Sequence, residues 1–194
     1  MNANTGHAKV ATAHNTIASI YKNQTQLDHA ITAFRKALAI QLKQLGPGHA
    51  DVGATYTSLG LVFHELGKYK EALDYHKKAL SIATKARGSA HPAVAAVHSN
   101  IGTILGEQGR FDQAVTHLGQ ALSILEAAVG TDHPDVAATL SQMGGAHSNA
   151  GNDKQALECF EKALAIRADK LGGDHPATEE VRARVVLLRG GAAS

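Results

Sequence analysis

The chain has 194 residues, of which 44% are hydrophobic and 19% are charged. This balance excludes a disordered tail, and the longest aliphatic run, residues 185–188, is far shorter than the roughly 20 residues that a membrane span needs. The net charge is only +2, because 19 basic residues face 17 acidic ones, which is too even for an electrostatic nucleic-acid binder. We therefore expect a soluble globular protein that binds neither nucleic acid nor membrane.

Cysteine usage and the first residues bear on the compartment. Cys159 is the only cysteine in the sequence, so the chain cannot form an internal disulfide. The sequence starts without a basic segment followed by an apolar one, so no secretory signal peptide is expected. Both observations fit a reducing compartment, and we predict cytoplasmic localisation.

A repeat with a period of 42 residues runs along the chain. Columns of alanine, leucine, isoleucine and glycine keep this period, and so does a column of histidines: His7, His49, His91, His133 and His175. Repeats of this length bury their apolar faces by stacking on one another. In chain order the period predicts an N-terminal extension (1–6), four repeats (7–48, 49–90, 91–132 and 133–174), a C-terminal capping helix (175–189) and a flexible tail (190–194).

Each repeat carries two helical patterns. In residues 49–90, apolar residues recur at steps of three and four from Val52 to Phe63 and again from Ala72 to Ile82, and Gly67 interrupts the pattern between them. This spacing predicts a helix A of about 14 residues and a helix B of about 17 residues, joined by a tight turn.

Turn residues and small residues mark fixed places in the repeats. Glycine stands where helix A ends, because a left-handed backbone conformation at this place favours glycine. In the first repeat Thr25 replaces the glycine, which predicts a less regular turn. Proline falls in the first turn of the next helix A, where a missing N–H costs nothing, at Pro92, Pro134 and Pro176. A small residue in helix A faces an alanine in helix B and predicts close approach of the two backbones: Ala18, Gly60, Gly102 and Gly144 opposite Ala30, Ala72, Ala114 and Ala156.

These columns resemble those of a known family. The small residue of helix A, together with two alanine columns in helix B, is similar to the tetratricopeptide repeat (TPR). The 42-residue length and the junction Gly-x-x-His-Pro-x-Val-Ala resemble the kinesin light chain type. The resemblance covers residues 7–189 and implies an all-α fold, a right-handed α-solenoid of stacked antiparallel helix pairs (TPR superhelix) with the A helices along its concave side.

The two ends of the predicted array differ. Val181, Val185 and Leu188 of the capping helix are expected to cover the last helix B. The N-terminal end has no equivalent cap, since the repeat phase starts at His7. Either the first helix A is polar enough to be exposed to solvent, or this end packs against another surface.

No catalytic, metal or cofactor site is predicted, and we expect no enzyme. The repeat histidines occur once per repeat, and stacked helices hold equivalent positions about 10 Å apart, which is too far for ligands of one Zn²⁺. We expect them to hydrogen-bond the turn between repeats, and His14 and His98 to be packing residues of helix A. Cys159 lies inside a helix B without a triad-like neighbourhood, and no GxGxxG or P-loop sequence occurs.

The resemblance implies that ligands bind in the concave groove, at fixed positions of helix A. Those positions hold short hydroxyls and amides for the most part. Positions two, five, six and nine of helix A hold no Lys or Arg in the four repeats, so the carboxylate clamp of chaperone-binding members is absent. Gly145 has no packing reason: either it lets a ligand backbone approach, or it simply weakens that helix. The predicted groove residues are Asn15, Thr16, Ser19, Thr57, Ser58, Leu61, His64, Ser99, Asn100, Thr103, Ser141, Gln142, Gly145 and Asn149.

Hydroxyls and amides can hydrogen-bond the backbone of an extended peptide. We therefore predict a non-enzymatic scaffold, similar to kinesin light chain-type adaptors, that binds an extended, weakly charged peptide or partner segment in its groove. Three alternatives stay open. The chain can be a structural element that forms a homo-oligomer through its uncapped N-terminal end, or a sensor segment of a larger signalling or motor-associated protein. The groove residues can also be a solvated, unused face.

Overall fold

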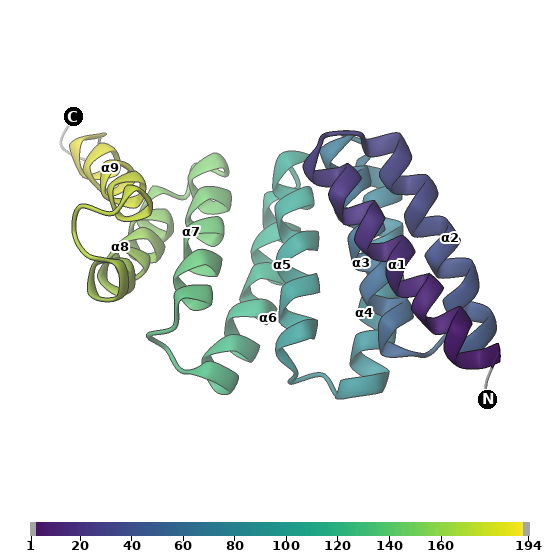
Figure 1. The fold of residues 1–194 in the computed structure, drawn as a ribbon. Coiled ribbons are helices and arrows are strands. Elements are labelled where there is room, and N and C mark those ends of the chain that lie inside the picture. Colours follow the sequence, from purple (N-terminus) through teal and green to yellow (C-terminus); the bar gives the residue numbers. More distant parts are fainter. Residues whose placement is uncertain (1–2, 192–194) are drawn as a thin grey trace. The chain divides into compact units, whose positions relative to one another are not determined.

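The structure is a computed structural model that describes residues 3–191, with side chains described for residues 9–190. Within these residues the chain forms helices and turns and no strand, which confirms the all-α prediction. The chain divides into two compact units, an N-terminal unit, Met1–His91, and a C-terminal unit, Pro92–Ser194. Figure 1 shows the helices of each unit in chain order.

The helices alternate between type A and type B. The N-terminal unit contains α1 (Ala3–Asn23), α2 (Leu27–Leu45), α3 (Ala50–Glu65) and α4 (Tyr69–Arg87). The C-terminal unit contains α5 (Pro92–Glu107), α6 (Phe111–Val129), α7 (Pro134–Asn149), α8 (Asp153–Leu171) and α9 (Pro176–Gly191). The odd-numbered helices are the A helices. The helices α1, α3, α5 and α7 each pack against the B helix that follows, and α3, α7 and α9 also pack against the B helix that precedes them.

The helices are longer than their apolar patterns. Helices α3, α5 and α7 have 16 residues and the B helices have 19, about two more than predicted, because helix ends drawn from an apolar pattern are uncertain by one or two residues. Helix α1 begins at Ala3, so residues 3–6, expected as an extension, belong to the first helix. Helix α9 ends at Gly191, inside the expected tail, whose last residues 192–194 lie outside the described part of the chain, as do residues 1–2.

The A and B helices of a repeat approach closely at the predicted glycines. A Cβ atom built on Gly60 would lie 2.7 Å from the ring of His76, and one built on Gly102 would lie 2.7 Å from Cγ of Leu118. Distances this short are clashes, so a larger residue in helix A would push the pair apart. The large side chain that fills the space stands one helical turn after the predicted alanine, which is itself fully buried at Ala114.

His76 occupies a place that other repeats give to apolar side chains. At the same register the B helices carry Phe34, Leu118 and Phe160, all buried. The His76 side chain is completely buried, and neither ring nitrogen has a hydrogen-bond partner. Burial, followed by the charge of nearby His64, lowers the pKa of His76 from 6.5 to about 4. The imidazole is therefore a neutral core residue.

The turn after α1 is as regular as the others, so the prediction of a less regular turn was wrong. Thr25 adopts φ 58° where Gly67 adopts φ 70°. The backbone N–H of Gln26 donates to the carbonyl of Tyr21 at 2.9 Å, which is the same bond that Lys68 makes in the next repeat. The hydrogen bonds of the turn hold the threonine in the left-handed region despite its β-branched side chain.

The C-terminal helix covers the last helix pair. Val181 and Val185 of α9 are buried in the same apolar core as Phe160 and Ala163 of α8, and Leu188 packs against that core. These are the side chains that the sequence assigned to a cap.

Acid should weaken folding through His76. Its pKa is lower in the folded chain than in the unfolded chain, so the native state binds fewer protons between pH 6.5 and 4. Stability is fully present above pH 6.5 and falls as the pH drops toward 4, by about 1.4 kcal/mol per pH unit. Urea unfolding at several pH values measures this slope. His76→Phe, which copies Phe160 opposite Gly144, should flatten it, and an unchanged slope in that variant would contradict the assignment.

Relief of the left-handed threonine should stabilise the chain. Thr25→Gly removes the Cβ conflict at φ 58° and should raise the free energy of unfolding by about 1 kcal/mol. The matched reverse change, Gly67→Thr, should lower it by a similar amount. Thermal unfolding of both variants measures the difference, and a lower melting temperature for Thr25→Gly would show that the turn is not strained.

Candidate functional site

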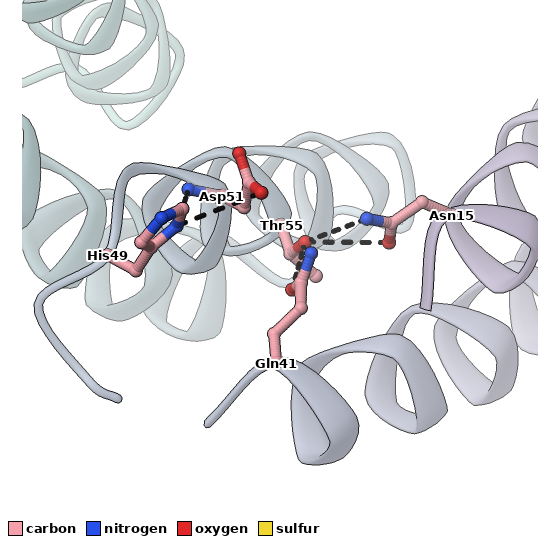
Figure 2. A network of polar contacts seen from close by, with 5 residues as sticks. All are labelled: Asn15, Gln41, His49, Asp51 and Thr55. Carbon is pink, nitrogen blue, oxygen red and sulfur yellow. Dashed lines mark hydrogen bonds and ion pairs between the residues drawn. The ribbon is translucent and has the colours of Figure 1, made fainter. Parts of the chain in front are cut away.

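The repeated histidines cap the A helices. Nδ1 of His49 accepts a hydrogen bond from the backbone N–H of Asp51 at 3.2 Å, and Nδ1 of His133 accepts one from Asp135 at 3.2 Å. His175 makes the same bond to the N–H of Ala177 at 3.1 Å. Each bond satisfies a free N–H of the first helical turn, as predicted for a junction residue. The cap of α3 is visible in Figure 2.

The remaining histidines of the column are placed differently. Nε2 of His91 lies 3.3 Å from the guanidinium of Arg87, and the side chain of His7 falls outside the described residues. Nowhere in the described part of the chain do three His, Cys, Asp or Glu side chains gather as metal ligands. Three histidines of the column, His49, His133 and His175, therefore have a structural role as helix caps.

His98 packs against a second histidine. Its Nδ1 lies 2.9 Å from Nδ1 of His117, which joins α5 to α6. Burial and the facing ring lower the pKa of His98, so one neutral ring donates and the other accepts. The sequence placed His98 among the packing residues, but it did not identify His117 as the partner.

Asn15, a predicted groove residue, is part of a polar network inside the N-terminal unit. Its Nδ2 donates a hydrogen bond to Oγ1 of Thr55 at 3.1 Å. The Thr55 hydroxyl in turn donates to Oε1 of Gln41 at 2.7 Å. Figure 2 shows Thr55 of α3 between Asn15 of α1 and Gln41 of α2. Thr55 and Gln41 are 1% and 5% exposed. The network thus connects three helices through a buried hydroxyl.

Sequence reasoning missed Thr55 and Gln41. The signal for both is a polar residue at a register where another repeat carries a large apolar one. The register of Thr55 is held by Val97 in α5, and that of Gln41 by Leu125 in α6. A polar residue in such a column must find a buried partner, because an unpaired one is costly.

Six of the seven hydroxyls of the predicted groove donate to their own helices. Oγ of Ser58 donates to the carbonyl of Ala54 at 3.1 Å, and Oγ1 of Thr103 donates to that of Ser99 at 3.1 Å. The same bond to the carbonyl four residues earlier is made by Thr16, Ser19, Thr57 and Ser141. With their protons used in this way, the hydroxyls offer lone pairs, so hydrogen-bond donors have to come from the amides.

The C-terminal unit brings six predicted groove residues together between α5 and α7. Oγ1 of Thr103 accepts a hydrogen bond from Nε2 of Gln142 at 3.2 Å, and Gln142 stands between two shallow depressions. One depression, of about 300 Å³, is lined by Ser99 and Asn100, with Leu125 of α6 among its apolar walls. The other, of about 200 Å³, is lined by Thr103, Gly145 and Asn149, with Leu118 of α6 among its apolar walls.

Two further features of these depressions bear on binding. A Cβ built on Gly145 would meet no atom within 4 Å, so the glycine leaves open space beside the helix. Leu118 and Leu125 belong to a B helix, and the sequence did not predict that B-helix side chains would line the groove. Of the other predicted residues, Leu61 is half-buried in α3, Ser141 is half-buried in α7, and the His64 ring lies 6.1 Å from the ring of Tyr69.

A larger depression, of about 530 Å³, lies where turns of the C-terminal unit meet. Gly109, Phe111 and Asn152 are among its lining residues, and Asn149 is the one predicted groove residue there. Its cation, Arg110, donates to the side-chain oxygens of Gln108 and Gln113. Because this guanidinium is already bound by neighbouring side chains, we place the candidate site between α5 and α7 instead.

Among known families, the one described as Tetratricopeptide repeat matches residues 9–85, 64–127, 93–169 and 135–184. No curated protein sequence matches the chain. Within the described residues no helix is long and apolar enough to cross a bilayer.

Several solved structures share the fold. A protein from Podosopora anserina, named after kinesin light chain and built of nearly identical TPR-like repeats, superposes with a TM-score of 0.82 at 22% identity, over 96% of this chain and 88% of that chain. BtubC (BKLC) from P. vanneervenii superposes with a TM-score of 0.77 at 26% identity, over 86% and 66% of the two chains. PilF of Pseudomonas aeruginosa gives a TM-score of 0.71 at 23% identity, over 97% and 71%. These likenesses confirm an all-α repeat fold, and the repeats are similar to those of the protein named after kinesin light chain.

The buried network should behave as a unit. Thr55→Val leaves Oε1 of Gln41 buried without its donor and should lower the free energy of unfolding by about 1–3 kcal/mol. Adding Gln41→Leu, so that both positions carry the residues of other repeats, should recover most of that loss. Urea unfolding of the two single variants and the double variant measures the coupling. Strictly additive losses would mean that the bond does not operate in solution.

Proposed function

The chain belongs to the tetratricopeptide repeat family, and on this basis we propose that it is a non-enzymatic scaffold that binds an extended, weakly charged peptide or partner segment between α5 and α7. The observation that carries the proposal is the pair of depressions on either side of Gln142. Successive side chains on one face of an extended peptide stand about 7 Å apart, so two of them can enter neighbouring depressions.

The polar groups between the depressions suit a peptide backbone. A primary amide has two N–H groups and a carbonyl oxygen, and Gln142 uses one N–H on Thr103. Its other N–H and the amide of Asn100 can donate to peptide carbonyls, while the hydroxyls of Ser99 and Thr103 can accept from peptide N–H groups. A backbone needs both kinds of partner, and this surface offers both.

The walls of the depressions set the side-chain preference. Leu118 and Leu125 are apolar, so they favour small or medium apolar peptide side chains. The charged residues among the lining residues are Asp135 and Glu107, and both are acidic. An acidic peptide would meet like charges here, and this disfavours an acidic partner.

The proposal includes the absence of catalysis and a cytoplasmic location. Cys159 is buried in α8, and burial raises the pKa of its thiol, which disfavours the reactive thiolate. The single cysteine supports a reducing compartment.

A side chain on Gly145 should block binding without harming the fold. Gly145→Leu fills the smaller depression, and because the glycine lies inside a helix with open space beside it, the variant should gain about 1 kcal/mol of stability. Peptides selected from a random display library on the native chain should lose at least about tenfold in affinity, or about 1.4 kcal/mol. Isothermal titration and thermal unfolding measure the two effects.

Gly119→Leu is the matched control. Gly119 also lies inside a helix, α6, and a Cβ there also meets no atom within 4 Å, but it lines neither depression. This variant should gain similar stability and keep the affinity. Failure of the selection to enrich any peptide, or equal affinities in both variants, would remove the support for a peptide groove between α5 and α7.

A further inference from the structure

Helix α1 exposes an apolar stripe. Val10, Ile17 and Ile20 are 45%, 43% and 49% exposed, and Ala13 between them is exposed as well. These four residues follow one another at steps of three, four and three, so they lie on one face of the helix. We call this face the α1 stripe. Isolated exposed apolar residues are ordinary, but an aligned set of this kind marks a surface that is normally covered.

The other A helices show what covers this register. In α3 the four equivalent residues are Val52, Thr55, Leu59 and Val62, and each is at most 1% exposed. Helix α3 packs against the preceding helix, α2, and α7 and α9 pack in the same way against α6 and α8. In α9 the equivalent Thr178, Val181 and Val185 are at most 4% exposed. The α1 stripe therefore carries the residue types of an internal packing surface, while its side chains face solvent.

The C-terminal helix is built differently on its outer face. At the registers where other A helices contact a following helix B, α9 carries Glu179, Arg182 and Arg189, and Val186 replaces the small residue. Arg182 pairs with Glu179, and Arg189 pairs with Glu161 at 2.6 Å. Ala183, Val186 and Leu187 of α9 are exposed as well and lie on one side of the helix. The ion pairs beside them place charges next to this apolar surface, so it matches the wholly apolar α1 stripe less well than a second α1 stripe does.

We propose that the α1 stripe docks against the α1 stripe of a second copy of this chain, in an antiparallel pair related by a two-fold axis. The order of steps, three, four and three, is the same when read backwards. In an antiparallel pair Val10 therefore faces Ile20 of the partner subunit, and Ala13 faces Ile17 of the partner subunit. A large side chain then meets a small one at the centre, and the surface is complementary to itself, as a two-fold interface requires.

Charge also favours a pairing of identical helices. Helix α1 contains no acidic residue, and its two lysines stay clear of the contact. Lys22 is turned to its own unit, where its Nζ lies 3.1 Å from Glu65. Lys9 flanks the stripe, and in the antiparallel pair the two copies of Lys9 are about 18 Å apart along the helix axis. That separation is roughly twice the screening length at physiological salt, so repulsion is weak.

Analytical ultracentrifugation over a wide range of protein concentration tests the pairing. The mean mass should rise with concentration toward that of two chains. Ile17→Glu, which buries a charge at the centre of the contact, should keep the chain monomeric, while circular dichroism shows it to be folded. Thr12→Glu adds the same charge to an exposed site of α1 away from the stripe and should still dimerise. A native chain that stays monomeric throughout, or an Ile17→Glu variant that dimerises as the native chain does, would overturn the proposal.

Disulfide trapping tests the direction of the pair, in a chain carrying Cys159→Ser. A mixture of Val10→Cys and Ile20→Cys chains should form cross-linked dimers under mild oxidation. Val10→Cys alone should not, because two copies of residue 10 lie about 15 Å apart along the antiparallel pair and a disulfide spans less than about 7 Å between Cα atoms. Cross-linking of Val10→Cys alone would overturn the antiparallel register, as would failure of the mixture to cross-link. Dimers with the groove variant Gly145→Leu should form normally, so the test is separate from that of peptide binding.

Discussion

The structure depends on the close approach of helices A and B within each repeat. At Gly60, Gly102 and Gly144 the A helix carries no side chain, and one large residue of helix B fills the space. The distances of 2.7 to 3.0 Å from a built Cβ leave no tolerance for another carbon atom. Because the pairs with these glycines are held at this spacing, the next A helix meets a surface of similar shape, and the repeats can stack.

This spacing has a cost where the filling residue is polar. His76 takes the position of Leu118 and Phe160, and the tight contact with Gly60 leaves its ring nitrogens without partners. A second buried polar residue is satisfied: Thr55 bonds to both Asn15 and Gln41. The two cases differ because Thr55 lies where three helices meet, whereas His76 points into a contact between two.

The fold leaves two kinds of surface on the A helices. Between α5 and α7, hydroxyls are already bonded to their own helix and amides remain as donors, which suits an extended backbone and needs little reorganisation on binding. On α1, the face that other A helices bury is exposed. The first surface offers polar complementarity to a peptide, and the second offers apolar complementarity to a helix. A protein that uses both would present its peptide grooves in pairs.

The sequence by itself determined the period, the helix pairs, the close approach of helices at the glycines and the place of the histidines at the junctions between repeats. Each of these rests on local spacing or on a single residue type at a fixed place, and both are visible in one chain read along its length. It also named Ser99, Asn100, Thr103, Gln142, Gly145 and Asn149, which the structure brings together. Their shared register on successive A helices was enough to place them on one face.

Only the tertiary structure decided which atoms these residues meet. The partner of Asn15 stands 40 residues away, and that of Gln142 stands 39 residues away, so no local pattern could supply them. The regular turn at Thr25 follows from the hydrogen bonds around it, which overcame the preference of its side chain. In the sequence the α1 stripe has the same apolar pattern as a buried stripe, because burial depends on whether a neighbouring helix covers the stripe and not on the stripe itself.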